Sequence, residues 1–373
     1  MGPKIGIVGG GQLGRMLGIA AKQLGFTVVV LDPNPDSPAG QVVDRQILGH
    51  YTDPDAIRRL AAEVDFLTFE IEQTDAGMLA EIAVRIPVNP SPGTLRIIQD
   101  KLAQKRFLET AGLPVAESRV IESRADLLSA SEAFGLPILL KARFDAYDGR
   151  GNAVIRKFDD VDSALARLSG SQLYCERFVP FEKELAVIAA RSADGAIAIY
   201  DVVETIQRRH ICQMVLAPAD IDARAAANAR QLAEHVMTHL EGAGVFGIEM
   251  FLTTSGEVVI NEIAPRVHNS GHYTIEACDT SQFEQQIRAI TGLPLGSTNQ
   301  IVPAVMVNLL GDRSGAADVR GLERALAIPN VAIHIYGKAE TRPERKMGHL
   351  TATGETLAIA RERAERAHDR ISI

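Results

Sequence analysis

The chain has 373 residues, 46% of them hydrophobic, and a formal net charge of −8. This length suits two or three domains with substantial cores, and the absence of a basic tract argues against nucleic acid as a partner. No segment approaches the ~20 apolar residues of a membrane span, and a strand-like segment rather than a signal peptide follows Lys4. Three dispersed cysteines argue against a zinc site or disulfide framework. We therefore expect a cytoplasmic protein that acts on small molecules.

The first elements of the chain match a dinucleotide-binding fingerprint. The segment Ile5–Val8 predicts a buried strand, the turn Gly9–Gly14 fits G-x-G-x-x-G, and a second strand, Thr27–Leu31, ends in Asp32. Such a turn presents a helix N-terminus to a phosphate. Taken alone, these residues predict NAD binding, although the proline-rich segment Asp32–Pro35 opposes it by making the chain after the acid rigid.

Two acids end the next predicted strand. Glu70 and Glu72 follow Phe66–Phe69 directly, and open α/β sheets bind ligands at the carboxyl ends of their strands. Either acid is a candidate for contact with a bound small molecule.

The middle of the chain contains features that suit a phosphate ligand. After a predicted linker, Asn89–Pro92, we expect a helix over Gln99–Ala111 that carries Lys101. Lys141 then ends an apolar strand, and the glycine-rich loop Asp145–Asn152 follows. Glycines allow backbone N–H groups to approach phosphate oxygens, and lysine supplies a point charge. A hairpin tip and a solvated lysine are the simpler alternatives.

The next segment suits a purine nucleoside. The strand-like run Tyr174–Pro180 offers backbone groups to a purine edge, and Glu184 follows as an acceptor for ribose hydroxyls. A helix is predicted over Ala223–Glu241. His235 and His239 lie four residues apart on it, but no third ligand accompanies them, which argues against a metal site.

A predicted hairpin carries two further acids. Glu249 and Glu262 lie in strand-like runs joined by the short turn Thr253–Gly256. Pairing of the strands would bring the two carboxylates together, and Mg²⁺ bound to phosphates is typically held by one or two carboxylates. The alternative is a hairpin with solvated acids.

The last segment alternates strands with basic residues. Strands are predicted over Ala304–Asn308 and Val331–Tyr336, and a charged helix follows Gly354. Lys338, Arg345 and Lys346 lie after the second of these strands; they form either a binding site for an anion or a solvated basic turn.

The order of these features resembles that of the ATP-grasp ligases over about residues 98–300. More narrowly, the motifs at 147–151, 261–272 and 342–349 resemble the 5-(carboxyamino)imidazole ribonucleotide synthetase family of bacterial purine biosynthesis, over nearly the whole chain. Two positions depart from the common family motif, Ala146 where glycine is usual and Asn152 where glutamine is usual. These departures concern the shape of the loop.

The resemblance implies a mixed α/β and α+β fold in three domains. A Rossmann-like domain would span residues 1–97, an ATP-grasp domain 98–300 with a mobile lid at about 118–182, and a small β-rich domain 301–373. It also implies a homodimer that uses ATP, Mg²⁺ and bicarbonate to carboxylate the exocyclic amine of 5-aminoimidazole ribonucleotide through carboxyphosphate.

The resemblance also implies roles for individual residues. Glu249 and Glu262 would hold Mg²⁺. The ribonucleotide would contact Gln12, Leu13, Glu70 (favoured over Glu72), Tyr147, Lys338, Arg345 and Lys346, with Asp32 left as a turn residue. Bicarbonate and the reacting phosphate would contact Arg150, Arg266, His268 and Asn269, His268 alternatively being a structural hydrogen bonder. The nucleotide would contact Lys101, Lys141, Ala146, Tyr147, Asp148, Gly149, Arg150, Gly151, Asn152, Glu176, Arg177, Phe178, Val179, Glu184, His210, Asn261 and Glu262.

Three other functions fit parts of the sequence. Another ATP-grasp ligase, such as the formate-dependent glycinamide ribonucleotide transformylase or a biotin carboxylase, would share the use of ATP. A dehydrogenase would explain the glycine turn but not the features downstream. A binding module without activity would not need both Glu249 and Glu262.

Overall fold

The computed structural model describes residues 2–145 and 151–373. Its N-terminal part is a parallel sheet in the order β3-β2-β1-β4, here called the N-terminal sheet. The strands are β1 (Lys4–Val8), β2 (Thr27–Asp32), β3 (Arg45–Leu48) and β4 (Phe66–Phe69), and the helices are α1 (Gln12–Gln23), α2 (Pro54–Ala61), α3 (Ala76–Ile82) and α4 (Pro92–Gln99). The Rossmann-like arrangement predicted for this part of the chain is confirmed.

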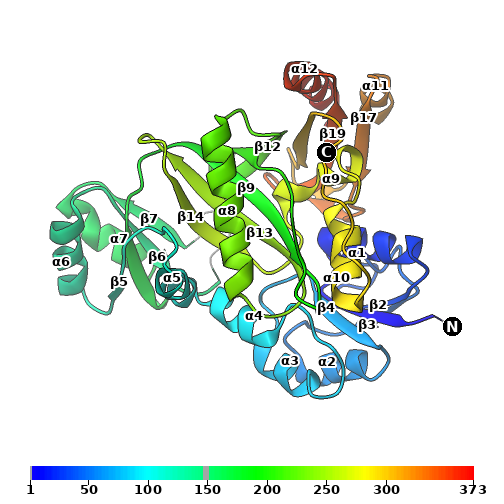
Figure 1. Cartoon of the computed structure of the whole chain (residues 1–373), viewed down its shortest axis with the longest axis horizontal. Coiled ribbons are helices and arrows are strands. Elements are labelled where there is room, and N and C mark those ends of the chain that lie inside the picture. Colours follow the sequence, from blue (N-terminus) through cyan, green and yellow to red (C-terminus); the bar gives the residue numbers. More distant parts are fainter. Residues whose placement is uncertain (1, 146–150) are drawn as a thin grey trace.

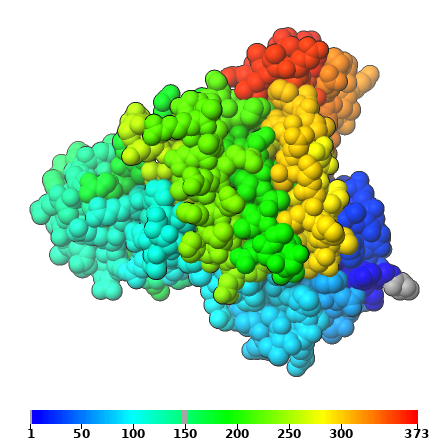
Figure 2. Space-filling view, in the orientation of Figure 1, coloured from blue at the N-terminus to red at the C-terminus, as the bar shows by residue number. Residues whose placement is uncertain are grey.

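A second, antiparallel sheet in the order β5-β8-β6-β7 forms a small lobe at about residues 118–177. Its elements are β5 (Ser118–Ile121), α6 (Arg124–Phe134), β6 (Ile138–Ala142), β7 (Asn152–Ile155), η1 (Phe158–Asp160), α7 (Val161–Arg167) and β8 (Leu173–Arg177). The lobe has a hydrophobic core of its own and projects from one side of the molecule (Figures 1 and 2).

The rest of the chain is built on one nine-stranded sheet, here called the central sheet. Eight strands follow the order β14-β13-β9-β11-β12-β15-β19-β17, and β10 pairs with β9. The strands are β9 (Phe181–Arg191), β10 (Ile197–Ile199), β11 (Val203–Arg208), β12 (Ile211–Ala217), β13 (Gly244–Thr253), β14 (Val258–Ala264), β15 (Ala304–Leu310), β17 (Val331–Ile335) and β19 (Lys346–Thr353). The C-terminal segment is β-rich as predicted, but its main strands extend the central sheet instead of forming a separate one.

Helices and short elements complete the architecture. They are α5 (Lys101–Thr110), α8 (Ala223–His239), η2 (Asn269–Gly271), α9 (Thr274–Ala277), α10 (Gln282–Thr291), β16 (Gly315–Ala316), α11 (Leu322–Leu326), β18 (Glu340–Thr341) and α12 (Leu357–His368). Within the described ranges, no helix has the length and apolar character needed to cross a membrane.

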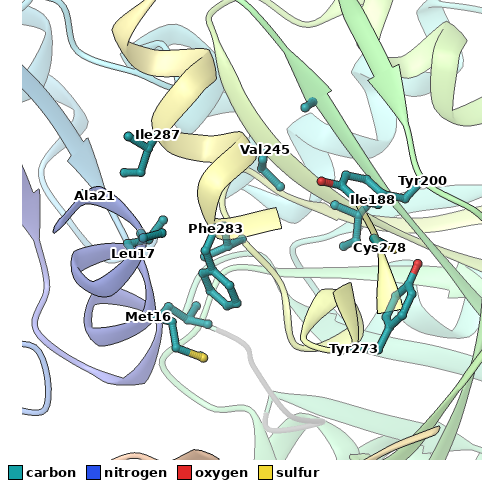
Figure 3. Packing of buried hydrophobic residues seen from close by; sticks show 14 of the residues in the cluster. Met16, Leu17, Ala21, Ile188, Tyr200, Val245, Tyr273, Cys278, Phe283 and Ile287 are labelled. Carbon is teal, nitrogen blue, oxygen red and sulfur yellow. The ribbon is translucent and has the colours of Figure 1, made fainter. Parts of the chain in front are cut away.

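Strand β9 connects two cores because its side chains alternate between the faces of the sheet. Leu185 and Val187 pack beneath α8, whereas Ile188 belongs to a cluster on the other face that includes residues of α1 and α10. In that cluster Leu17 of α1 and Phe283 of α10 lie close together (Figure 3). The N-terminal sheet and the central sheet therefore share a hydrophobic core.

The helix predicted over Gln99–Ala111 is found as α5, which begins at Lys101 because Asp100 accepts the N–H groups at its start and caps it. Gln99 itself ends the preceding helix, α4. The predicted linker Asn89–Pro92 leads into α4: Asn89 donates its N–H to a carbonyl of β4, and Pro92 begins the helix.

Two buried histidines, His272 and His349, and the partly exposed His334 form a row beside the central sheet. His349 pairs in register with Asn308 on one side and with His334 on the other, and its ring lies 4.5 Å from that of His334 and 4.7 Å from that of His272. The Tyr336 hydroxyl lies 2.9 Å from Nδ1 of His349. Burial lowers the pKa of His272 and of His349 well below the ordinary value, so both rings are neutral in the folded chain.

This row predicts a loss of stability in mild acid. The unfolded chain takes up protons at His272 and His349 as the pH falls below about 6.5, whereas the folded chain does not, so each residue removes about 1.4 kcal/mol of unfolding free energy between pH 7.5 and 5.5. Urea unfolding at both pH values measures the loss, and H349Q should reduce it by one such increment. H239Q changes an exposed histidine of α8 and is the control. An equal loss in wild type and H349Q would contradict the prediction.

Candidate active site

The predicted hairpin of β13 and β14 is confirmed, and it places Glu249 and Glu262 opposite each other in register. A bulge follows this pair, between Glu249 and Met250. Nζ of Lys101 lies 3.2 Å from Oε2 of Glu262, and Nε2 of His268 lies 3.4 Å from Oε1 of Glu249. The two acids thus lie side by side, and each is in contact with a nitrogen-containing side chain, lysine or histidine.

The electrostatics of this pair suit a cation. Burial, and then the charge of Glu262, raise the pKa of Glu249 to about 8. Burial also acts to raise the pKa of Glu262, but Lys101 and Lys141 outweigh it, and that pKa is lowered. Two closely spaced carboxylates, one of them protonated near neutral pH, provide hard oxygen ligands whose repulsion a divalent cation would relieve. The pair therefore fits Mg²⁺.

Glu184 of β9 lies near the same pair and contributes to the raised pKa of Glu249. Burial raises the pKa of Glu184 itself to about 7. Across the described ranges, no cluster of three or more histidine, cysteine or acidic side chains has the geometry to hold a metal on its own. Oxygens from a bound ligand would therefore have to complete the coordination of a cation here.

The small lobe and α5 together form a buried cluster of three charged side chains. Nζ of Lys141 lies 2.8 Å from Oε2 of Glu176, and Nζ of Lys105, on α5, lies 3.3 Å from Oε1. The lysines outweigh the effect of burial and lower the pKa of Glu176 to about 2. Lys141 and Glu176 were predicted from the sequence, but Lys105 was missed because a single lysine on a helix has the pattern of a solvated residue.

The glycine-rich loop is described only at its end. Ala146, Tyr147, Asp148, Gly149 and Arg150 lie outside the described residues. Asn152 pairs in register with Lys141, and the carbonyl of Gly151 accepts the N–H of Ala142. The loop therefore returns to the small lobe directly beside the lysine.

The other predicted nucleotide contacts lie in separate parts of the structure. The side chain of Arg177 points away from Glu176, because successive residues of β8 face opposite sides; it binds Glu117 at 3.0 Å and the carbonyl of Phe134 at 2.6 Å. Phe178 and Val179 connect β8 to β9. Asn261 precedes Glu262 on β14, and His210 lies in the β11–β12 turn with a φ of 64°.

The glycine turn of the N-terminal sheet binds a carboxylate of the protein. Glu70 accepts the N–H groups of Gly11 and Gly14, the latter at 2.9 Å. A Cβ atom at Gly11 would lie 2.7 Å from Oε1 of Glu70, so only glycine permits this approach. Asp32 accepts the N–H of Gly10 at 2.9 Å and that of Asn34 at 2.9 Å, and so it serves the turn. Glu70 occupies the place that a dinucleotide phosphate would need.

The remaining predicted contacts of the glycine turn lie at the start of α1. Gln12 is partly exposed there, whereas the side chain of Leu13 is buried in the core shared with α10. Leu13 can therefore offer a ligand its backbone more readily than its side chain.

Lys338 of the C-terminal segment lies close enough to this turn to interact with the charge of Glu70. Burial, then the charge of Arg345, lower the pKa of Lys338 to about 8, and Glu70 acts in the opposite direction. Nζ of Lys338 donates to the carbonyl of Lys346 at 2.6 Å, and Arg345 donates to the carbonyl of Glu340 at 2.6 Å. Segments more than 260 residues apart thus meet at the glycine turn. Lys346 is also close enough to affect the pKa of the metal-site acid Glu249.

The loop after β14 contacts both the segment that follows β4 and the carboxylate pair. Arg266 binds Oε1 of Glu72 at 3.0 Å, which separates the roles of the two acids that follow β4. Burial, then Arg266, lower the pKa of His268 to about 3, so its ring is neutral, and Nδ1 lies 2.8 Å from the Ser270 hydroxyl. The amide of Asn269 exchanges two hydrogen bonds with that of Asn308, at 3.0 and 2.6 Å. This partner is 39 residues away and was not predicted.

Three family models match successive parts of the chain. They are the ribonucleotide synthetase preATP-grasp domain over residues 2–99, the ATP-grasp domain over 106–283 and the phosphoribosylaminoimidazole carboxylase C-terminal domain over 304–363. Among curated proteins, the N5-carboxyaminoimidazole ribonucleotide synthase of Brucella melitensis is 41% identical, with 94% of this chain and 96% of that protein aligned. The phosphoribosylaminoimidazole carboxylase of Ogataea methanolica is 44% identical, but the match spans only 68% of its length.

Solved structures give the same result. The N5-carboxyaminoimidazole ribonucleotide synthetase of Thermotoga maritima is 48% identical, with a TM-score of 0.91 over 100% of this chain and 99% of that one. The N5-carboxyaminoimidazole synthase of Aspergillus clavatus, in complex with ADP and 5-aminoimidazole ribonucleotide, is 39% identical, with a TM-score of 0.91 over 99% of each chain.

Proposed function

The chain belongs to the family of N5-carboxyaminoimidazole ribonucleotide synthetases, and we propose that it carboxylates the exocyclic amine of 5-aminoimidazole ribonucleotide with ATP and bicarbonate. The observation that carries the proposal is the convergence of three groups: the Glu249–Glu262 pair, the Glu70-bound glycine turn and the C-terminal cations. A nucleotide site and a site for a phosphorylated acceptor would thus adjoin.

The chemistry explains why both sites are needed. Bicarbonate is a poor electrophile, because its leaving group is hydroxide. Attack of its oxygen on the γ-phosphorus of ATP expels ADP and gives carboxyphosphate. The amine then attacks the carboxyl carbon, the bond to phosphate breaks, and the nitrogen loses a proton. Carboxyphosphate has to be kept from water between these steps, which a closed site achieves.

The residues near the carboxylate pair take part through charge and orientation. Glu249 and Glu262 would hold Mg²⁺, which neutralises phosphate charge when it is bound. Arg266, fixed by Glu72, supplies a cation beside bicarbonate. His268 is neutral, so it contributes a hydrogen bond rather than a charge. Asn269, restrained by Asn308, presents a fixed amide. Fixed donors of this kind stabilise developing charge without having to reorganise.

Other parts of the proposal rest on the family resemblance. They are the domain limits 1–97, 98–300 and 301–373, closure of a lid at about 118–182, a homodimeric state and a cytoplasmic location.

Phosphate release tests the reaction directly. Release should require ATP, bicarbonate and 5-aminoimidazole ribonucleotide together, and each is omitted in turn. Formate in place of bicarbonate, with glycinamide ribonucleotide as acceptor, tests the transformylase alternative. Release that depends on formate would overturn the proposal.

Replacing Glu262 with Gln should nearly abolish turnover. The substitution removes a charge and a ligand oxygen from the metal pair, so a loss of several kcal/mol of transition-state stabilisation lowers kcat by roughly a thousandfold or more. E257Q changes an exposed acid of the same hairpin and should retain wild-type activity. Activity of E262Q within tenfold of wild type, with an unchanged circular dichroism spectrum, would refute the metal site.

Replacing Lys338 with Met should act on the ribonucleotide and not on ATP. We propose that Lys338 and Arg345 bind the 5′-phosphate, and a charge-assisted contact contributes about 1.5–3 kcal/mol. KM for the ribonucleotide should therefore rise roughly tenfold to a hundredfold, and KM for ATP should stay constant. K22M removes an exposed lysine of α1 and is the control. A rise confined to KM for ATP would place Lys338 in the nucleotide site instead.

A further inference from the structure

Helix α5 contacts both halves of the proposed nucleotide site through one face. Lys101, Gln104 and Lys105 share that face because they are three and four residues apart. Lys101 binds Glu262 at 3.2 Å. Gln104 donates to the carbonyl of Ile263 at 3.1 Å and accepts its N–H at 3.0 Å. These contacts fix α5 to the central sheet and leave Lys105 directed at the small lobe.

Lys105 lies in the buried charge cluster of the small lobe. Its side chain is 3% exposed, that of Glu176 is 5% exposed, and that of Lys141 is 13% exposed. Each lysine approaches a different oxygen of the Glu176 carboxylate, at 3.3 and 2.8 Å. Two cations and one anion give these three residues one net positive charge, and Glu262, which binds Lys101, also acts on Lys105 and Lys141.

The surplus charge points to an anionic ligand. Burial of a charge is costly unless an opposite charge compensates it. Among the described side chains, Oε1 of Glu176 has no hydrogen-bond donor, although Nζ of Lys105 is at ion-pair distance. Lys105 therefore acts on the carboxylate mainly through charge. Without it, Lys141 would be neutralised by Glu176 and would have less attraction for an anion.

We propose that Lys105 is a positioning residue for the nucleotide, which offsets the charge of Glu176 so that the charge of Lys141 remains available to the anionic ligand. This inference rests on the proposed function. It differs from a purely structural role, in which Lys105 would only join α5 to the small lobe and its loss would affect folding without regard to the charge of Glu176.

A double-mutant cycle separates these roles. Binding of ADP with Mg²⁺ is measured by calorimetry for wild type, K105M, K105R, E176Q and the double variant K105M/E176Q. K105M should weaken binding at least about tenfold, and K105R should stay within about threefold of wild type. K105M/E176Q should bind ADP within about threefold of wild type, because removal of the Glu176 charge restores the one net positive charge that K105M loses.

Steady-state kinetics provide a second test of the role of Lys105. KM for ATP should rise in K105M, and KM for the ribonucleotide should stay unchanged. K183M is the matched control, since Lys183 forms a 2.8 Å ion pair with Glu204 and faces the other side of β9 from Glu184. Its affinity for ADP should equal that of wild type.

The outcomes distinguish this inference from the proposed function. Equal affinities of wild type and K105M, or a double variant K105M/E176Q that binds ADP as weakly as K105M, would overturn the inference alone. If K105M does not fold, K105M/E176Q and K105R carry the test, and a loss of more than about tenfold from wild type to K105M/E176Q overturns it. A wild-type chain that binds no ADP would overturn the proposed function as well.

Discussion

Two partly buried carboxyl groups held side by side are the constraint on which the site depends. Glu249 and Glu262 are register partners, so the backbone pairing of β13 and β14 fixes their closeness and no side-chain movement fully removes it. Burial, and then the charge of Glu262, raise the pKa of Glu249, so Glu249 holds a proton near neutral pH. Lys101 balances the charge of Glu262. The rest of the site holds this pair where a cation can bind between the two carboxyl groups.

The shared core fixes the functional groups of the site relative to one another. Helices α1 and α10 pack together between the N-terminal sheet and the central sheet, and the C-terminal strands continue the central sheet. The glycine turn, the carboxylate pair and the C-terminal cations therefore belong to one packed body. The small lobe has a separate core, and its polar connection to that body runs through α5. The charged groups of the site therefore come from two hydrophobic units, which α5 joins.

Local sequence patterns predicted much of this site. Contacts between side chains far apart in the sequence could not be predicted. The hairpin was visible because two apolar runs flank a short turn, and Glu70 was visible because it ends a strand. Lys105 could not be singled out, since its partner Glu176 lies 71 positions further along the chain, in a strand of the small lobe. The Asn269–Asn308 pair was hidden for the same reason.

The glycine turn shows why a motif alone does not determine a ligand. G-x-G-x-x-G provides N–H groups at a helix N-terminus, and an anion satisfies them. In this chain the anion is the side chain of Glu70, delivered by the neighbouring strand β4. Its presence turns a cradle for phosphate into a surface with a carboxylate oxygen, which repels a pyrophosphate and accepts hydrogen bonds from hydroxyl groups. Lys338 and Arg345, which come from the opposite end of the chain, then supply the positive charge that the turn no longer offers. The anionic part of a ligand would thus lie toward the C-terminal segment and its hydroxyl groups toward the turn, an orientation that the turn sequence could not have specified by itself.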